Sequence, residues 1–418
     1  MSTIDTSPPG GAGMASRSIA STLLLCFLIV TLDGLDTISI TFVAPILAKA
    51  WGMSPAAMVP AFVATNLGAV IGYMVSGPLA LRTSARTVML GSVLLFGLGS
   101  LATALATDIT SLSVLRFVTA LGLGGALPIA ISKATEMVSP RRGSMVAMAI
   151  ATGLSAGGLL AGLAGMPLMV HYGWTSIFIL GGILPLLLLP WIFVCFRETQ
   201  TMPVPAAVEK QTSPLRALFG TGLASRTIML WLFAFLVFVD AYALISWLPT
   251  LGLQMGLPPE KAPTVAAVFS LGGIVGDVLL IVLATRNQTA GTLMVAVAIT
   301  LISIAAFSLI MPLPVGAILP IVLGLGMGLI PCCVGQAALA VSIYPTRLRA
   351  TGIGWAAALG RIGSIVGPGL GGMVLAFGWA PQQIVLAAGL PALVALALLV
   401  WFMRRPDGAA MAPGGNPA

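Results

Sequence analysis

The sequence predicts an all-α membrane protein with twelve transmembrane helices in two pseudo-symmetric bundles of six. Its composition is the first observation behind this prediction. Hydrophobic residues make up 58% of the 418 residues and charged residues only 7%, whereas soluble globular proteins contain about 25% charged residues. Glycine (49 residues) and proline (29 residues) are abundant, as in membrane helices that pack closely or are locally broken.

The second observation is a series of twelve apolar runs. Each is long enough to cross the hydrocarbon core of a bilayer, which takes about 20 helical residues. The first run lacks a small-residue cleavage site, so we interpret it as a retained span and not as a signal peptide. We expect spans at 20–47, 57–80, 87–106, 111–132, 144–169, 174–195, 227–250, 262–284, 291–311, 314–342, 352–376 and 382–403.

The third observation is an internal repeat at an offset of about 204 residues. LGLGGALP at 121–128 matches LGLGMGLIP at 323–331. The same offset pairs Asp36, nine residues before Pro45, with Asp240, nine residues before Pro249. Two six-helix bundles related by an axis along the membrane normal are typical of a secondary transporter, with its site between the halves near the bilayer midplane.

The longest polar gap divides the spans six and six and sets the expected domain boundaries. We expect an N-terminal tail at 1–18, a six-helix bundle at 19–195, a linker at 196–225, a second bundle at 226–403 and a C-terminal tail at 404–418.

Basic residues predict the orientation. Of the 19 lysines and arginines, only Lys49 and Lys261 fall in the loops opposite the N-terminus, and only Arg116 and Arg361 lie inside spans. The positive-inside rule therefore places the tails and the linker in the cytoplasm. We expect a bacterial inner-membrane protein that functions as a monomer.

Several function classes are disfavoured. The net charge of +8 is spread over short loops, so we expect no nucleic-acid partner. The four cysteines lie in or at the ends of apolar segments, without metal-ligand or disulfide spacing. With no nucleotide-binding loop either, we expect no enzyme activity, no cofactor and no metal.

Two acidic residues in the first span are the leading functional candidates. Asp33 and Asp36 lie in TLDGLDTISI, and an ionised carboxylate near the bilayer centre costs about 2.5–3.5 kcal/mol. Being three apart, they lie near one helix face, where repulsion favours protonation of at least one. We expect them to take part in proton coupling; the alternative is a static buried salt bridge.

The two arginines inside spans are candidates for binding an anionic substrate, because a guanidinium suits a carboxylate through its planar pair of donors. Arg116 would pair with a span 1 aspartate or attract the substrate; alternatively, it reaches the external interface as a helix-end arginine. Arg361 lies nearer the centre of its span, and its alternative is a structural pair with Asp240 or Asp277.

Span 7 and its neighbours supply the remaining candidates. Asp240 is a third candidate for proton coupling, although a structural polar contact is an equal alternative. We expect Tyr242, Trp247 and Gln336 to line the substrate cavity, while noting that aromatic residues in membrane helices more often pack or anchor at the interface.

The motifs resemble the major facilitator superfamily and, within it, the aromatic acid:proton symporters that import 4-hydroxybenzoate, protocatechuate, benzoate and similar acids. LDGLDTISITFVAP resembles that family's first-span D-G-x-D signature, and RFVTALGLGGALP at 116–128 its fourth-span motif. YALISWLPTL at 242–251 and YPTRLRATGIGWAAALGRIGSIVGPGLGG at 344–372 are similar to its spans 7, 10 and 11. The resemblance covers nearly the whole chain and implies twelve helices and no cofactor.

One loop departs from the superfamily pattern. Between spans 2 and 3 the superfamily reads G-x-L-x-D-R-x-G-R-[KR], whereas this chain reads GPLALRTSAR at 77–86, with Leu81 in place of the aspartate. The equivalent loop after span 8, at Thr285–Arg286, also lacks an acid. The resemblance implies that this aspartate helps latch the cytoplasmic side shut, so the usual latch is in doubt.

We therefore expect an importer of a small aromatic carboxylate that is driven by proton symport with alternating access. The first alternative is a proton-coupled drug exporter of the same fold. Such exporters carry G-x-x-x-G-P-x-x-G-G in span 5, where this chain has Gly158 in place of the proline. A transporter-like sensor is the second alternative, and the short tails argue against it.

Overall fold

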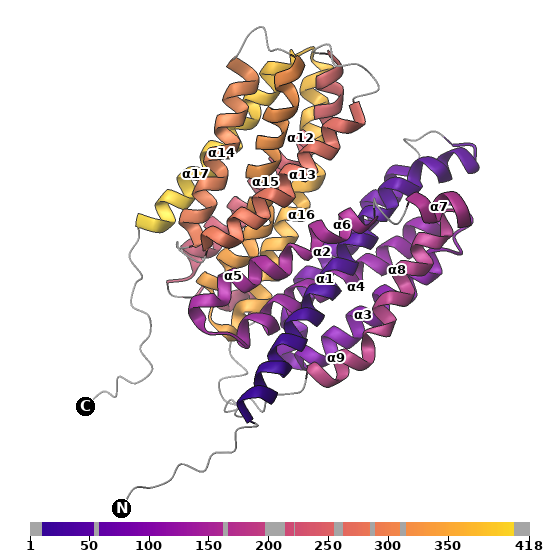
Figure 1. The fold of residues 1–418 in the computed structure, drawn as a ribbon, viewed down its shortest axis with the longest axis vertical. Coiled ribbons are helices and arrows are strands. Elements are labelled where there is room, and N and C mark those ends of the chain that lie inside the picture. Colours follow the sequence, from indigo (N-terminus) through magenta and orange to yellow (C-terminus); the bar gives the residue numbers. More distant parts are fainter. Residues whose placement is uncertain are drawn as a thin grey trace, which may run out of the picture. The chain divides into compact units, whose positions relative to one another are not determined.

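The computed structural model describes residues 11–53, 58–161, 166–196, 214–220, 222–254, 262–284, 289–309 and 315–404, and within them every regular element is a helix. Helices run side by side in each of two compact units, Met1–Glu209 and Lys210–Ala418 (Figure 1). Most of both predicted tails and of the predicted linker lies outside the described residues.

In the first unit, the four leading predicted spans each form one helix, and the next two are interrupted. Pro190 has no backbone N–H to continue the helical ladder, and the chain turns at Leu188 between α8 and α9. The helices are α1 (Gly11–Ala50), α2 (Val59–Arg82), α3 (Ala85–Thr103), α4 (Ile109–Glu136), α5 (Pro140–Ala151), α6 (Gly153–Leu160), α7 (Met166–Tyr172), α8 (Thr175–Leu187) and α9 (Leu189–Cys195).

In the second unit, each of the six predicted spans forms one helix, with boundaries within a few residues of those expected. A short helix inside the predicted linker, α11, precedes them. The helices are α11 (Pro214–Ala217), α12 (Ala224–Gln254), α13 (Ala262–Ala284), α14 (Thr289–Leu309), α15 (Val315–Ile343), α16 (Thr346–Ala376) and α17 (Pro381–Arg404).

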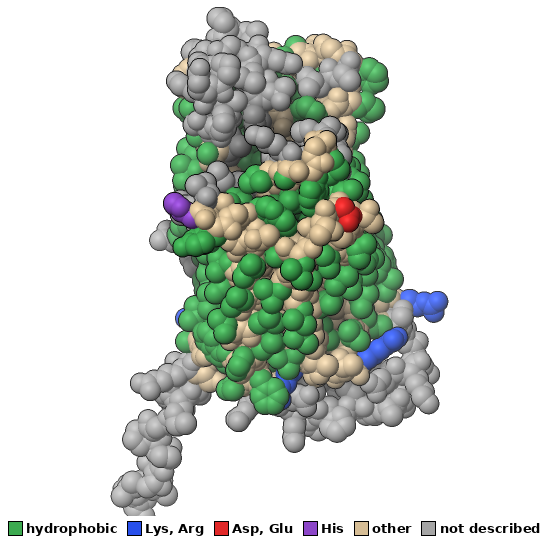
Figure 2. Space-filling view, turned by 90° about the vertical axis from the view of Figure 1, so that its right-hand side faces the viewer, with side chains coloured by type: hydrophobic (Ala, Val, Ile, Leu, Met, Phe, Trp, Pro, Cys, Tyr) green, Lys and Arg blue, Asp and Glu red, His purple; other side chains and the backbone are tan. Residues whose placement is uncertain are grey.

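The described helices are suited to a bilayer. Ten stretches among them are long and apolar enough to cross a membrane, and a shorter apolar helix covers Ala267–Leu283. The remaining predicted span, α16, is 31 residues long but contains Arg347, Arg349 and Arg361. Figure 2 shows a face covered by hydrophobic side chains, with Lys and Arg side chains gathered at one margin. The protein is a multi-pass membrane protein.

Equivalent glycine contacts confirm the internal repeat. Gly68 and Gly72 bring α2 so close to α4 that an added Cβ would collide with backbone carbonyls of α4. Gly272 and Gly276, 204 residues later, do the same for α13 against α15. Helices in lipid associate through such close packing of small residues, so each unit is built on the same pair of contacts.

Candidate functional site

The first unit contains a fully buried ion pair. Arg116 Nη1 donates a hydrogen bond to Asp36 Oδ2 over 2.7 Å, and the two side chains are 0% and 1% exposed. Arg116 lies two turns inside α4, whose N-cap is Asp108. The alternative in which Arg116 reaches the external interface is therefore wrong.

Two further helices complete the surroundings of this pair. Ser100 on α3 donates a hydrogen bond to Asp36 Oδ1 over 2.8 Å, and its hydroxyl also lies 3.1 Å from the Phe178 carbonyl on α8. The Arg116 guanidinium lies 5.6 Å from the centre of the Phe178 ring. Donors thus occupy both oxygens of Asp36, an arrangement complementary to the carboxylate anion.

Arg116 does not use all of its hydrogen-bond donors. Its Nε and Nη2 atoms are buried and have no hydrogen-bond acceptor within the described part of the chain. A guanidinium has five N–H donors, and a buried donor without an acceptor costs about 1–3 kcal/mol. The donors that remain on Arg116 would suit a second acceptor beside Asp36.

Asp33 lies one turn earlier on α1 and has different contacts. Its side chain is 1% exposed, and its Oδ1 accepts a hydrogen bond from Thr37 over 3.2 Å. The two aspartates of the motif are therefore both buried, as the sequence predicted, but their hydrogen-bond partners differ.

Glycines determine where α1 lies. A Cβ on Gly34, between the two aspartates, would collide with the Leu154 backbone of α6, and one on Gly157 of α6 would collide with the Thr31 carbonyl of α1. Gly157 in span 5 thus faces span 1. Because the contact is backbone to backbone, it fixes the depth of Asp33 and Asp36.

The second unit contains the other predicted site residues. Asp240 is 2% exposed and Gln336 is 5% exposed, while Arg361 is half-buried. The thiol of Cys333 lies within electrostatic range of Asp240, Asp277 and Arg361. Asp240, Asp277 and Arg361 therefore lie in the neighbourhood of Cys333 on α15.

The two predicted aromatic residues of span 7 have packing contacts. The Trp247 indole N–H donates to the Pro368 carbonyl over 2.9 Å, and its ring lies against Gly371 and Gly372. Tyr242 stacks on Phe238, with ring centres 5.9 Å apart. Their role in substrate binding stays a prediction.

Comparison with known proteins identifies the family. The family model described as Major Facilitator Superfamily matches residues 26–338. The chain is 34% identical over 409 residues to the 4-hydroxybenzoate transporter PcaK of Pseudomonas aeruginosa. The aligned region covers 90% of this chain and 91% of that protein. The chain belongs to the major facilitator superfamily, in the family of its aromatic acid transporters.

Two further similarities agree with this membership. The 3-(3-hydroxy-phenyl)propionate transporter of Escherichia coli K12 is 35% identical over 397 residues, covering 94% of this chain and 96% of that protein. The crystal structure of the fucose:proton symporter FucP of Escherichia coli is 15% identical, with a TM-score of 0.74 over 93% of this chain and 98% of FucP. This second similarity shows the major facilitator fold.

The loop that departs from the superfamily pattern is compact. Ser84 caps α3 by accepting a hydrogen bond from the Thr87 backbone N–H over 3.1 Å. The Arg86 guanidinium lies 3.5 Å from the centre of the Phe193 ring on α9, a cation–π contact. With Leu81 in place of the aspartate, this loop contains no acidic side chain. The equivalent loop of the second unit, at Thr285–Arg286, lies outside the described residues.

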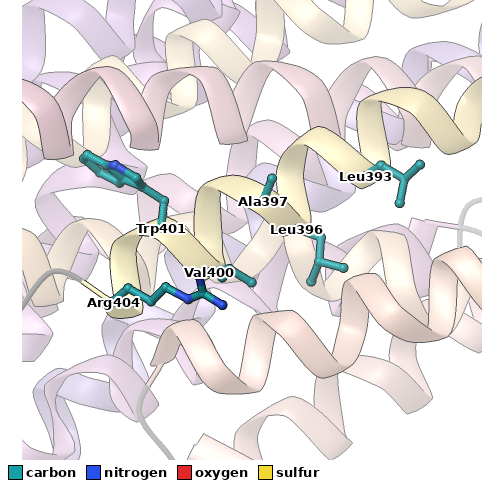
Figure 3. A pocket seen from close by; sticks show the side chains of 6 residues that line it. All are labelled: Leu393, Leu396, Ala397, Val400, Trp401 and Arg404. Carbon is teal, nitrogen blue, oxygen red and sulfur yellow. The ribbon is translucent and has the colours of Figure 1, made fainter.

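Sequence reasoning missed Ser100 and Phe178. Neither belongs to a motif. Ser100 reaches Asp36 from α3, which packs against α8, the helix that carries Phe178. The groove in Figure 3 was not expected either. It runs along α17 and carries no acidic side chain, so it does not belong with the site residues; its lining is Leu393, Leu396, Ala397, Val400, Trp401 and Arg404.

Proposed function

We propose that this protein imports a small aromatic carboxylate together with protons across the bacterial inner membrane, with both termini in the cytoplasm and the monomer as the functional unit. The observation that carries the proposal is the buried Asp36–Arg116 pair with its unused guanidinium donors. The similarity to transporters named for 4-hydroxybenzoate and 3-(3-hydroxy-phenyl)propionate supports the choice of substrate class.

Energetics favour coupling to protons. Moving a monoanion inward against an inside-negative potential costs about 2.3 kcal/mol per 100 mV. One cotransported proton cancels that charge and adds the driving force of the pH gradient. Proton symport therefore converts an unfavourable movement of an acid anion into accumulation.

The residues divide into two roles. Asp33, Asp36 and Asp240 take up and release protons. Arg116 and Arg361 hold the substrate carboxylate, with Tyr242, Trp247 and Gln336 as further substrate contacts. When a carboxylate binds the free donors of Arg116, the guanidinium shares its charge between two anions. Asp36 is then held less strongly, and this links substrate binding to its protonation.

Uptake measurements test this function. We expect cells that produce the protein to accumulate labelled hydroxybenzoate-type acids, faster at low external pH, and to lose accumulation with a protonophore. Neutral amide analogues of the same acids should not accumulate. Accumulation that survives the protonophore would contradict symport, and protonophore-sensitive expulsion of the compounds would indicate an exporter instead.

A further inference from the structure

Ser100 on α3 is a buried hydroxyl with two acceptors at hydrogen-bond distance. Its side chain is 0% exposed, and its Oγ lies 2.8 Å from Asp36 Oδ1 on α1 and 3.1 Å from the Phe178 carbonyl on α8. A serine hydroxyl has one hydrogen to donate and two lone pairs that accept. Ser100 can therefore make a full hydrogen bond to only one of these two oxygens at a time.

While Asp36 is ionised, the Ser100 hydrogen points to Asp36. A hydrogen bond to a carboxylate is about twice as strong as one between neutral groups, and the distance to Asp36 Oδ1 is the shorter of the two. Arg116 donates to the other oxygen, Oδ2. The Phe178 carbonyl does not depend on Ser100, because it also accepts from the backbone N–H four residues later in α8.

A proton on Asp36 allows a second arrangement in which every group is again satisfied. Arg116 occupies Oδ2, so the proton belongs on Oδ1, which faces Ser100 Oγ. The carboxylic acid then donates to a lone pair of Ser100, and the Ser100 hydrogen turns to the second lone pair of the Phe178 carbonyl. The exchange requires rotation of one hydroxyl and no movement of a helix.

One turn of α8 lies against all three polar side chains. A Cβ on Gly181 would lie 3.2 Å from Ser100 Oγ and 3.5 Å from Asp36 Oδ1. The ring of Phe178, three residues earlier and on the same face, lies 5.6 Å from the Arg116 guanidinium carbon. The backbone of α8 is therefore close enough to the pair to take part in its hydrogen bonding.

Few charged groups face Asp36 in the described part of the first unit. The helices packed on α1 are α4, α5, α6, α8 and α9, of which α6 and α8 carry no titratable side chain. Arg116 is paired with Asp36, and Asp33 lies one turn earlier on α1. The other titratable side chains of the packed helices and of α3 lie near helix ends: Arg86 on α3, Lys133 and Glu136 on α4, Arg141 and Arg142 on α5, and Cys195 on α9. Arg116 and Asp33 are therefore the charged groups nearest to a proton on Asp36.

We propose that Ser100 is a positioning residue for proton coupling, whose hydroxyl donates to the Asp36 anion and turns to the Phe178 carbonyl when Asp36 Oδ1 carries the proton. The inference rests on the proposed function, in which Asp36 takes up and releases a proton. The Asp36 O–H bond forms when a proton enters from outside and breaks when it leaves for the cytoplasm, while the Ser100 O–H bond stays intact. Ser100 thus gives both forms of a buried carboxyl group a hydrogen-bond partner.

Infrared difference spectroscopy of the purified protein tests this arrangement without substrate. Lowering the pH should produce a carboxylic acid C=O band that is absent in Asp36→Asn and present in Asp33→Asn. In Ser100→Ala the band should shift to higher frequency, because the carbonyl of a carboxylic acid strengthens when its O–H loses an acceptor.

Thr103→Val is the matched control for the infrared band. It removes another buried hydroxyl of α3, one that donates to the Gly99 carbonyl of its own helix, and it should leave the band in place. A band that ignores Ser100→Ala, or that Thr103→Val shifts equally, would overturn the proposal, as would the absence of any band that depends on Asp36.

The pH dependence of substrate counterflow is the second measurement. Ser100→Ala removes a charge-assisted hydrogen bond from the Asp36 anion but only a neutral one from the acid. The profile should therefore move toward alkaline pH by about one pH unit. Thr103→Val should keep the profile of the parent, and Ser100→Ala should shift nothing in an Asp36→Asn background. An unchanged profile in Ser100→Ala, or an equal shift without Asp36, would refute the role of Ser100.

A second substitution and the parent protein complete the test. Ser100→Cys keeps a side chain of similar size but offers only a weak donor and acceptor, so it should move the band and the profile in the same directions even where Ser100→Ala does not fold. Failure of the parent to transport aromatic acids would instead reject the proposed function and leave the infrared result valid.

Discussion

Arg116 and Asp36, 80 residues apart in the sequence, form a 2.7 Å hydrogen-bonded ion pair between α4 and α1 that is almost completely buried. Removing one partner of such a pair leaves an uncompensated charge, which costs about 3–5 kcal/mol. Breaking the pair would therefore destabilise the first unit and change the charge beside the D-G-x-D motif.

A double-mutant cycle measures this coupling. Arg116→Gln should lower the free energy of unfolding by about 3–5 kcal/mol, because it leaves the Asp36 anion buried. Adding Asp36→Asn should restore a large part of that loss, since the neutral amides can hydrogen-bond to each other. Denaturant unfolding in detergent gives the values. Strictly additive losses would mean that the two side chains do not depend on each other.

The glycine between the aspartates should tolerate no side chain. Gly34→Ala places a methyl group against the Leu154 backbone, and overpacking of this kind costs about 1–3 kcal/mol. Gly158→Ala on α6 is the matched control, because its Cβ would lie 3.4 Å from the Ile38 side chain, an ordinary contact. Thermal unfolding should therefore separate the two variants, and equal midpoints would contradict the close approach of α1 and α6.

Asparagine variants of Asp33 and Asp36 test the proposed role of these residues in proton coupling. We expect Asp36→Asn to abolish uphill uptake yet allow substrate exchange, because exchange does not require the empty, deprotonated carrier to return. Counterflow and accumulation assays in proteoliposomes distinguish these modes. Complete pH-dependent accumulation by both Asp33→Asn and Asp36→Asn would return the two residues to a structural role.

Arg361 tests the substrate class. An aromatic carboxylate in a low-dielectric site needs a cationic partner. Losing that partner costs about 2–5 kcal/mol of binding free energy, which weakens the affinity at least roughly 30-fold. Binding of the acid should weaken from the parent to Arg361→Lys, which lacks the planar pair of donors, and further to Arg361→Gln. Calorimetry on folded protein measures this order, with the amide analogue as the control ligand. Unchanged binding by Arg361→Gln would exclude this arginine.

Asp108 should make stability pH-dependent outside the membrane spans. The backbone N–H of Ser111, together with that of Thr110, holds the pKa of the Asp108 carboxyl below its ordinary value. The stabilisation is therefore present above the unfolded pKa, about 3.9, and is lost as the pH falls through the lower folded pKa.

Asp108→Asn provides the matched comparison, because asparagine also caps a helix but does not titrate in this range. The parent should unfold at a higher temperature than this variant at pH 6, and the difference should shrink towards pH 3. A difference that stays constant over this range would show that the Asp108 charge contributes nothing.

The sequence by itself determined the membrane class, the number of spans and the internal repeat. Lipid permits few polar side chains and no unsatisfied backbone, so apolar runs of sufficient length report helices directly. For the same reason Asp33, Asp36, Asp240, Arg116 and Arg361 stood out as candidates. The agreement is close for α2, observed at Val59–Arg82 against the predicted 57–80.

Only the tertiary structure decided which of these groups meet. Periodicity places Asp33 and Asp36 near one face of α1, but it cannot show that Arg116 and Ser100 approach Asp36 while Thr37 contacts Asp33. The repeat suggested equal roles for Asp36 and Asp240, yet Asp36 forms an ion pair, whereas Asp240 forms none with the residues that the structure describes. The physical reason is that the cost of a buried charge depends on atoms within a few ångströms, and helix packing brings those atoms from distant parts of the chain.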